Sequence, residues 1–455
     1  MPSLFVGMFL LIFFVPQFFA QFPGMPEFLR PADIVGAACL AIYAVLRLTV
    51  KRNVNPAERL LLLFLLWSFV VSSAGLVLIG SMPEYARKMG VEQVLYPVRH
   101  LFIFGPGLLA FALKPPPRAF VRLGLFAFTA AAIFVIFMTL AYMAGSDAFN
   151  AHQSLRDGGI VGAAPSSPLL GNYFKRMGGI VGESGAYAFH GLFVIAALTV
   201  FAFLGGMSRL GYVLIAATPL WALMVFATSQ SRILLLTLGA FLLVLLLDRR
   251  VVTRSLALTV CLAVAAAVGA AALLVVVLDL SVPINPLLAL RFQALLEGRV
   301  SGVQLTSGRL EHWGNVVELL AYNPVLGYGY RNVGFMLDHG VENFFLQGLS
   351  EFGFIGFVFF LAFLFRIWRA MGREMIGSPA RDQRAKAVMR AMLAAALVQW
   401  QVNDINTYWL TFPMMIALSI LVISHTGSWT SAAARPGDAG SRADPAPRVL
   451  PAMGG

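Results

Sequence analysis

The segment from Thr306 to Gly356 reads TSGRLEHW at 306–313, then NPVLGYGY at 323–330, then ENFFLQGLSEFGFIG at 342–356. Its ionisable side chains include Arg309, Glu311, His312 and Glu342. The last motif runs directly into a long apolar stretch. Charged groups at the edge of a membrane are costly unless they are used. We therefore expect a functional site where this polar segment meets a membrane-spanning helix.

Composition indicates the class of protein around this segment. Of the 455 residues, 59% are hydrophobic and 12% charged, which excludes an ordinary water-soluble domain. Apolar runs of about 20 residues, enough to cross ~30 Å of hydrocarbon as a helix, recur along the chain. We predict twelve spans, at 4–20, 32–50, 59–81, 95–113, 119–144, 184–206, 209–227, 231–247, 254–278, 344–366, 387–403 and 407–424.

These runs are continuously apolar and do not alternate with polar residues, which favours helices over barrel strands. The prediction is an all-α polytopic membrane protein of about twelve transmembrane helices, with a large extracytoplasmic loop between the ninth and tenth helices. Its organisation would be 1–144 for helices one to five, 145–183 for an extracytoplasmic loop, 184–278 for helices six to nine, 279–343 for the large loop, 344–424 for the last three helices, and 425–455 for a disordered cytoplasmic tail.

The distribution of Lys and Arg predicts the orientation of the spans. Twelve spans put both termini on one side, and that side carries 21 of the 33 basic residues but only 6 of the 21 acidic ones. Cytoplasmic termini follow. A net charge of +12 also occurs in nucleic-acid-binding proteins, but here the basic residues stand at helix ends and form no single patch.

Signals for processing, disulfides and metals are weak. The first apolar run lacks a basic n-region, and Phe18 stands where a cleavage site needs a small residue, so we expect an uncleaved first helix. Only Cys39 and Cys261 occur, both inside expected spans, which indicates buried fillers and neither a disulfide framework nor a metal site.

The large loop contains one clear helical pattern. Its apolar residues at helical spacing are Leu310, Val316, Val317 and Leu320. They predict a helix over 308–322 with Ser307 as its N-cap, ended by Asn323 and Pro324. Gly327 and Gly329 then allow a turn. We expect this turn to bring its two tyrosines near the surface of the bundle.

Together these motifs resemble the bacterial O-antigen ligase and polymerase superfamily. The resemblance rests on SGRLEHW, an NPxxGxG turn and xNxxLQxLxExGxxG entering a helix, and it covers most of residues 170–366. Two further segments match: TSQSRILLL at 228–236, similar to the family's SR with a leucine four residues after the arginine, and RMGGIVGESGAYA at 176–188, similar to its RxxGxF loop.

The resemblance implies an inverting glycosyltransferase of the membrane-embedded glycosyltransferase type that needs no metal or other cofactor. Its donor would be glycan on undecaprenyl diphosphate, its acceptor a glycan or lipid-linked glycan, and its site the periplasmic face of the bacterial inner membrane. A departing diphosphate needs cationic partners, and guanidinium groups hold phosphate oxygens in pairs. Arg232 and Arg309 are the expected pair, although Arg232 at a helix end also suits an arginine that merely reaches for the interface.

The catalytic base is the point at which the sequence departs from the ligases. Ligases carry His before Asn, Ser or Gln at this position, whereas Glu342 precedes Asn343 here. The base would be Glu342, or His339 from the preceding loop, and Glu342 also suits a structural ion pair with a loop arginine. The motifs ENFFLQ and GESG resemble polymerases more than ligases.

Further residues are expected to bind substrate. Lys175, Arg176 and Glu183 would contact the donor's phosphate or sugar. Aromatic and polar groups of the large loop and the tenth span would contact the glycan, namely His312, Trp313, Tyr328, Tyr330, Asn343 and Gln347. The aromatic residues equally suit a role as interfacial anchors.

Two other functions fit parts of the pattern. An O-antigen ligase would transfer the glycan to lipid A-core and not to another repeat unit. A permease or lipid-linked sugar flippase would also have twelve spans, but transporters place ionisable groups near the midplane, whereas most of these lie at outer ends. The expected partners are the lipid-linked donor, the acceptor, membrane lipids and a chain-length regulator, with no nucleic acid.

Overall fold

The computed structural model describes residues 31–50, 53–113, 116–143, 184–229, 233–251, 264, 309–338, 341, 343–373, 378–401 and 411–429. These residues form thirteen helices and no strand, which confirms the all-α prediction. The helices are α2 (Pro31–Thr49), α3 (Pro56–Gly80), α4 (Pro83–Ala86), α5 (Val91–Ala112), α6 (Pro117–Met143), α8 (Ser184–Leu204), α9 (Ser208–Ser229), α10 (Ile233–Leu247), α15 (Arg309–Tyr322), α16 (Asn332–Leu337), α17 (Phe344–Gly372), α18 (Ala380–Gln399) and α19 (Thr411–His425).

The helices have the length and composition of a polytopic membrane protein. Five are long and apolar enough to cross a bilayer: α3, α5, α6, α8 and α17. Two shorter helices, α10 and α19, are also apolar. Ten of the twelve expected spans coincide with helices of the structure. The expected spans at 4–20 and 254–278 fall outside the described residues, residue 264 apart, and the division into domains remains a prediction.

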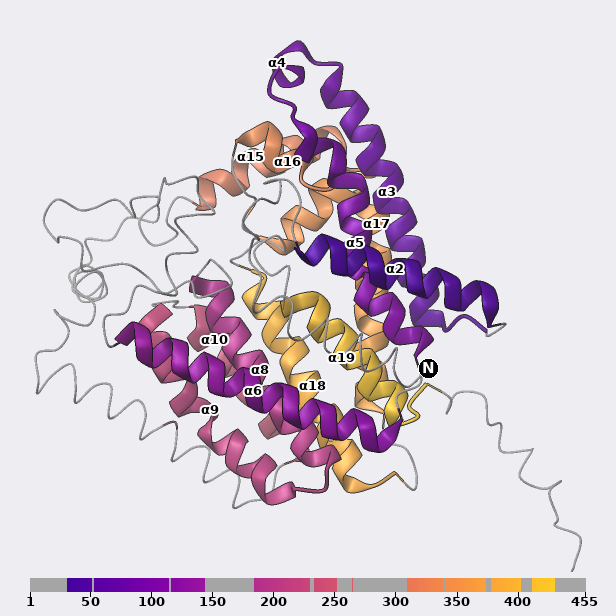
Figure 1. Cartoon of the computed structure of the whole chain (residues 1–455). Coiled ribbons are helices and arrows are strands. Elements are labelled where there is room, and N and C mark those ends of the chain that lie inside the picture. The colour runs from indigo at the N-terminus through magenta and orange to yellow at the C-terminus, as the bar shows by residue number, and fades with distance from the viewer. Residues whose placement is uncertain are drawn as a thin grey trace, which may run out of the picture.

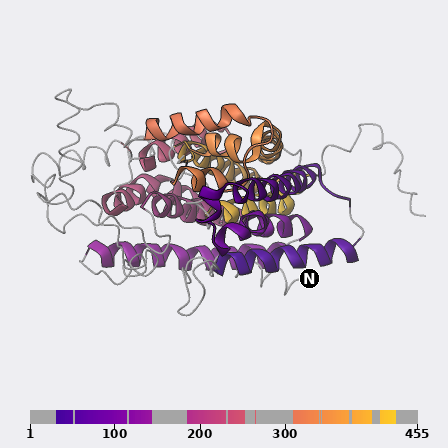
Figure 2. The same cartoon turned by 90° about the horizontal axis from the view of Figure 1, so that it is seen from above.

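The helices form two groups around a shared core (Figure 1). α3 packs against α5 and α17, while α8 packs against α6, α9 and α18, and α10 against α18. α19 joins the groups because it contacts α5, α8, α17 and α18. Seen from above, the indigo and purple helices at one edge lie opposite the orange α15 (Figure 2). In Figure 1, α15 and α16 lie at the end of the bundle that also holds α4.

Small residues allow the closest helix crossing. α2 crosses α5 at Gly36 and Gly105, where a Cβ on Gly36 would lie 2.1 Å from the Phe102 carbonyl oxygen. Such backbone contact is typical of helix pairs in membranes, where packing replaces the hydrophobic drive. Cys39, one turn along α2, is 1% exposed, so its interpretation as a buried filler is confirmed. Cys261 lies outside the described residues.

Candidate functional site

The helix predicted in the large loop is present, and it packs against the tenth expected span. α15 begins at Arg309 and ends at Tyr322, within one residue of the expected 308–322. It contacts α17, and a small core of Val316, Tyr328, Val333 and Val341 joins α15, α16 and the turn between them. The loop therefore folds back onto the end of the bundle where α17 begins.

The NPVLGYGY turn is bound to a break in α17. Gly353 has φ +63 and ψ −179 inside this helix, which interrupts the helical hydrogen bonds. The carbonyl of Ser350 instead accepts a hydrogen bond from the Tyr328 N–H (2.9 Å), and the carbonyl of Glu351 accepts one from the Gly329 N–H (2.6 Å). Two motifs separated in sequence thus form one hydrogen-bonded unit, and a non-glycine residue at 353 would be strained.

The same turn is held from its other side by α3. Gly329 has φ +89, and a Cβ there would lie 2.4 Å from the Ser72 Cα. The Ser72 hydroxyl accepts a hydrogen bond from the Tyr330 N–H at 2.8 Å. A Cβ on Gly75 would lie 1.9 Å from the Tyr328 carbonyl oxygen. The turn is therefore clamped between α3 and α17 with backbone in contact on both faces.

The turn itself was predicted, but the position of its tyrosines was not. Tyr330 is fully buried, and its ring stacks on His100 with the ring centroids 4.7 Å apart. The Phe352 ring also stacks on His100 with the ring centroids 4.8 Å apart, and the Ser68 hydroxyl lies 2.6 Å from the His100 Nδ1. The expectation that the tyrosines lie at the surface was wrong, because the close approach to α3 carries Tyr330 into the bundle.

Tyr328 also turns inward. It is 9% exposed, and its hydroxyl donates a hydrogen bond to the Leu319 carbonyl at 3.0 Å. Burial chiefly, with the nearby Tyr322, raises the pKa of Tyr328 above its usual value. Contact of either tyrosine with a sugar remains a prediction. Among the other expected sugar contacts, His312 and Trp313 are half-buried in α15, and the Trp313 Nε1–H has no hydrogen-bond partner within the described part of the chain.

Asn343 begins α17 and ties it to α18. Its Oδ1 accepts hydrogen bonds from the N–H groups of Phe345 and Leu346, both at 3.0 Å, which is the arrangement of an N-cap. Its Nδ2 donates to the Gln401 carbonyl at 3.0 Å, and the Phe344 N–H donates to the Trp400 carbonyl at 2.8 Å. This asparagine thus has a structural role, and its predicted contact with substrate remains untested.

About two turns further along α17 lies a carboxylate that sequence reasoning missed. Glu351 is 1% exposed, and its Oε1 accepts a hydrogen bond from the Gln347 Nε2 at 3.0 Å. Gln347 is equally buried, so its amide is used within the protein. The signal was present in the sequence, because a glutamate inside an apolar span four residues after a glutamine marks a polar helix face.

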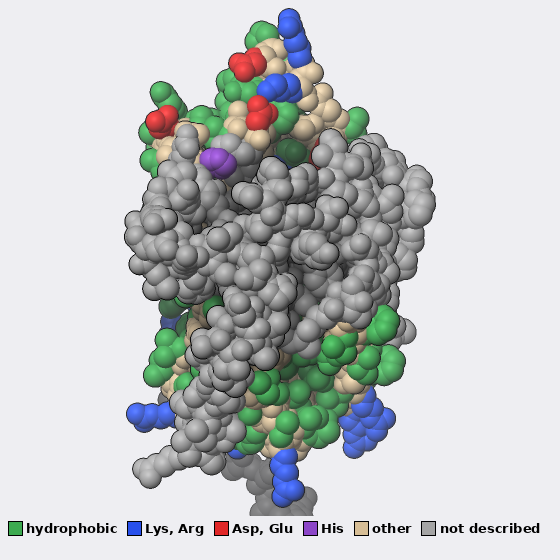
Figure 3. All heavy atoms as spheres, turned by 90° about the vertical axis from the view of Figure 1, so that its left-hand side faces the viewer, with side chains coloured by type: hydrophobic (Ala, Val, Ile, Leu, Met, Phe, Trp, Pro, Cys, Tyr) green, Lys and Arg blue, Asp and Glu red, His purple; other side chains and the backbone are tan. Residues whose placement is uncertain are grey.

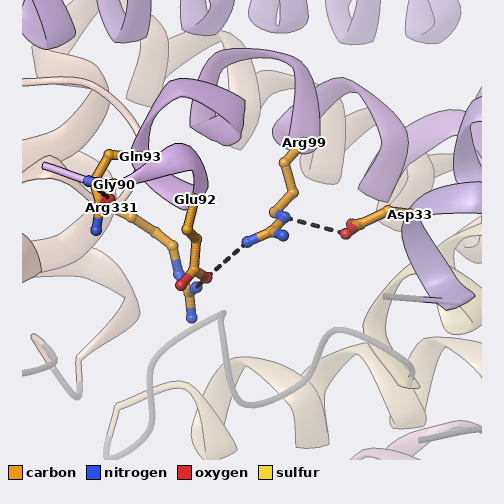
Figure 4. Close-up of polar contacts among 6 residues, drawn as sticks. All are labelled: Asp33, Gly90, Glu92, Gln93, Arg99 and Arg331. Carbon is orange, nitrogen blue, oxygen red and sulfur yellow. Dashed lines mark hydrogen bonds and ion pairs between the residues drawn. The ribbon is translucent and has the colours of Figure 1, made fainter. Parts of the chain in front are cut away.

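A chain of alternating charges leads away from the turn (Figure 4). Arg331, which directly follows Tyr330, has φ +62 and lies over the Tyr96 ring. Its guanidinium is 3.5 Å from Glu92, which also pairs with Arg99 at 2.9 Å.

Arg99 continues the chain to Asp33 in the first turn of α2, at 3.2 Å. The side chains of Arg99 and Asp33 are 1% and 4% exposed, so this pair is shielded from water. Figure 4 shows the two arginines and two carboxylates following one another from the turn to α2. In the sequence these residues counted only toward net charge, since nothing in their spacing showed that they meet.

The predicted catalytic groups are only partly placed. Arg232, His339 and Glu342 lie outside the described residues, as do Lys175, Arg176 and Glu183. The side chain of Arg309 is also outside them, although its backbone starts α15. Their convergence on one pocket therefore remains a prediction.

The helices that follow Arg232 and Glu342 in sequence, α10 and α17, are connected to each other through α18. Near the start of α10, the Thr237 hydroxyl donates a hydrogen bond to the side-chain oxygen of Gln399 at 2.5 Å. Gln399 ends α18, and the next residue, Trp400, accepts the hydrogen bond from Phe344 at the start of α17. The first turns of α10 and α17 are thus joined through the end of α18. Arg232 directly precedes the first of these helices, and Glu342 directly precedes Asn343.

A family comparison agrees with the motifs. Residues 217–361 match a family model described as O-antigen ligase. The matched segment runs from α9 to α17 and contains the turn and all four predicted catalytic residues. A comparison with curated proteins found no match. Residues 217–361 of this helical membrane protein are therefore similar to the O-antigen ligase family, which supports the O-antigen ligase and polymerase superfamily.

Proposed function

We propose that this protein is an inverting, metal-independent glycosyltransferase that polymerises a surface polysaccharide from glycan carried on undecaprenyl diphosphate. The family match supports a membrane enzyme of the O-antigen ligase and polymerase type. The choice of polymerase rests on Glu342, which stands where the ligases carry histidine, and on its neighbours in ENFFLQ. We place both termini in the cytoplasm and the site at the periplasmic face of the inner membrane, following the distribution of basic residues.

The observation that carries this proposal is the junction of α10, α17 and α18. The hydrogen bonds of Gln399, Trp400 and Asn343 hold the first turns of α10 and α17 at one end of the bundle. α15, which starts at Arg309, packs against the same α17. This arrangement supports a shared pocket for Arg232, Arg309 and Glu342, because each is adjacent in sequence to an element held there.

The proposed step is a single displacement. The acceptor hydroxyl oxygen forms a bond to the anomeric carbon while the bond from that carbon to the diphosphate oxygen breaks. Arg232 and Arg309 stabilise the charge that develops on the departing diphosphate. Glu342, or His339 in its place, accepts the proton of the acceptor hydroxyl. The products are a longer glycan and undecaprenyl diphosphate.

A reconstituted assay tests the chemistry. Purified protein and lipid-linked oligosaccharide should yield a ladder of longer glycans. Arg309→Ala should lower the rate by about 100-fold or more, as expected for loss of a group that stabilises transition-state charge. Arg122→Ala is the matched control, because Arg122 is exposed on α6 and far from the matched segment in sequence. Wild-type glycan lengths with Arg309→Ala would refute the proposal.

The match to a family described as O-antigen ligase favours ligase activity as the second candidate. A strain that lacks the gene separates the two. Loss of a polymerase should leave glycans of one repeat unit, whereas loss of a ligase should leave long polymer that is not attached to its acceptor. Replacing Glu342 by Gln and, separately, His339 by Gln would then identify the base, since only the true base should abolish transfer while the protein still inserts and folds.

A further inference from the structure

The end of the bundle opposite the turn is rich in arginine. α17 ends here at Gly372, and α18 begins at Ala380. Basic side chains surround the lower end of the molecule in Figure 3. The connections are tied together, because Arg250 donates a hydrogen bond from Nη1 to the Met371 carbonyl (3.0 Å) and Lys386 donates to the Arg373 carbonyl (2.6 Å). The arginines here therefore lie on a fixed framework.

Arg390 of α18 differs from the exposed arginines around it. Its guanidinium carbon lies 4.4 Å from the centre of the Trp368 ring. A Cβ on Gly372 would lie 3.3 Å from that carbon, so the backbone of α17 also comes close to the guanidinium. The Arg390 Nε is shielded from solvent without a hydrogen-bond partner, and within the described part of the chain no acceptor or ion-pair partner contacts this side chain.

The carboxylate that acts electrostatically on Arg390 is hydrogen-bonded elsewhere. Asp248, just after α10, accepts hydrogen bonds from the Arg250 Nε (2.8 Å), its backbone N–H (3.1 Å) and its Nη2. Arg250 and Asp248 both act electrostatically on Arg390. One negative charge thus faces two guanidiniums and is bonded to only one of them. The cluster of Arg250, Asp248 and Arg390 carries an excess positive charge that is partly withdrawn from water, which is costly without an anion.

The depth of this cluster suits a lipid headgroup. α17 has 29 residues. Its part beyond the break at Gly353, residues 354–372, is about 28 Å long at 1.5 Å per residue, so it crosses most of ~30 Å of hydrocarbon and ends near the interface. Trp368 and Gly372 lie in its last turns, at the level where tryptophan is enriched in membrane proteins. Leu243 and Leu247 at the end of α10 are 57% and 73% exposed, which provides apolar surface for acyl chains.

We propose that Arg390, with Trp368 and Gly372 beside its guanidinium and Arg250 nearby, binds the phosphate of an anionic phospholipid in the leaflet at this end of the bundle. The guanidinium would donate paired hydrogen bonds from its free edge to two phosphate oxygens. Trp368 supports the planar group and adds a cation–π contact. This inference concerns a site remote from the glycan and does not depend on the proposed transfer reaction.

Lipid-dependent stability of the purified protein tests the site. The protein is delipidated in detergent, and its melting temperature is measured with phosphatidylglycerol, with phosphatidylcholine of the same acyl chains, and with inorganic phosphate. We expect phosphatidylglycerol to raise the melting temperature well above the effect of the other two. Arg390→Gln should weaken the apparent affinity for phosphatidylglycerol by about tenfold or more, since it removes a charged, paired contact. Arg366→Gln, at an exposed position on α17, should leave it unchanged.

Native mass spectrometry gives an independent reading if Arg390→Gln is unstable. Arg390→Lys keeps the charge but lacks the paired donors, so it should retain fewer phosphatidylglycerol molecules than wild type at equal lipid concentration. Equal retention by Arg390→Lys, Arg390→Gln and wild type would overturn the proposal. So would equal stabilisation by phosphatidylcholine. A full effect of inorganic phosphate, with nothing added by phosphatidylglycerol, would overturn the assignment to a lipid.

Discussion

The two ends of α17 are held by different kinds of interaction. At its beginning, the amide oxygen and the amide nitrogen of Asn343 both form hydrogen bonds, and the break at Gly353 leaves backbone carbonyls that bind the turn. At its end, the side chains of Arg250 and Lys386 each donate a hydrogen bond to a backbone carbonyl of the chain near Gly372. Arg390 packs on the Trp368 ring there. Close backbone contacts allow little movement, whereas long charged side chains can adjust their positions to a ligand. The difference suits chemistry at the first end and attachment to lipid at the second.

The largest expected effect comes from breaking the turn away from α17. Gly353→Ala should lower the free energy of unfolding by about 3–5 kcal/mol, because left-handed backbone strain adds to a clash between the new methyl group and backbone. That methyl would lie 2.1 Å from the Val325 carbonyl oxygen. Thermal or denaturant unfolding in detergent measures the loss. Gly239→Ala in α10 is the control. A Cβ added at this position would meet no described atom within 4 Å apart from the backbone of its own helix, so the change should be neutral or stabilising.

The buried ion pair at the same end should be next in size. Arg99→Leu removes the shielded ion pair with Asp33, so we expect a loss of about 3 kcal/mol, the lower end of the range for a broken buried pair. The double variant Arg99→Leu with Asp33→Leu removes both charges and should recover part of this loss. A double-mutant cycle measured by unfolding checks both statements. A double variant less stable than the sum of the two single changes would contradict an ion-pair explanation.

A smaller change should loosen the start of α17 without breaking the turn. Asn343→Ala removes the helix cap and the hydrogen bond to Gln401, which together should cost about 1–2 kcal/mol. Asn343→Asp keeps the capping oxygen and should recover most of the stability. Hydrogen exchange of the first turn of α17 would localise the effect, and unchanged exchange there in Asn343→Ala would contradict it.

The smallest effect concerns the charged end and depends on pH. Burial alone would raise the pKa of Asp248, but the hydrogen bonds and charge of Arg250 outweigh it and hold the pKa below its usual value. The carboxylate therefore stabilises the fold above its unfolded pKa of about 3.9, and this contribution is lost as the pH falls through the folded pKa. Wild type should melt higher than Asp248→Asn at pH 7, and the gap should narrow below about pH 4. A constant gap would contradict this assignment.

The sequence predicts the elements well because each depends on local pattern. α17 begins at Phe344, where its span was expected, and α15 occupies almost the expected residues. Gly327 and Gly329 have positive φ, as the turn required.

The break at Gly353 could not be predicted, because it depends on hydrogen bonds from a segment elsewhere in the chain. The same holds for the burial of Tyr330 against α3 and for the pairing of Arg331 with Glu92 and of Arg99 with Asp33, since each pair is distant in sequence. The roles of Glu351 and Arg390 likewise depend on neighbours that no periodicity reveals. Local signals thus give the helices, and only tertiary packing gives the site.

The clamp on the turn has a consequence for engineering. The segment that matches the ligase family spans 217–361, yet its turn rests on Ser72 and Gly75, which belong to α3 outside that segment. In a chimera that takes only the matched segment from a relative, the turn of that segment would pack against the unaltered α3, and the backbone contact there leaves no room for a larger side chain. Exchanging specificity between such proteins would therefore require transplanting α3 together with the segment it supports.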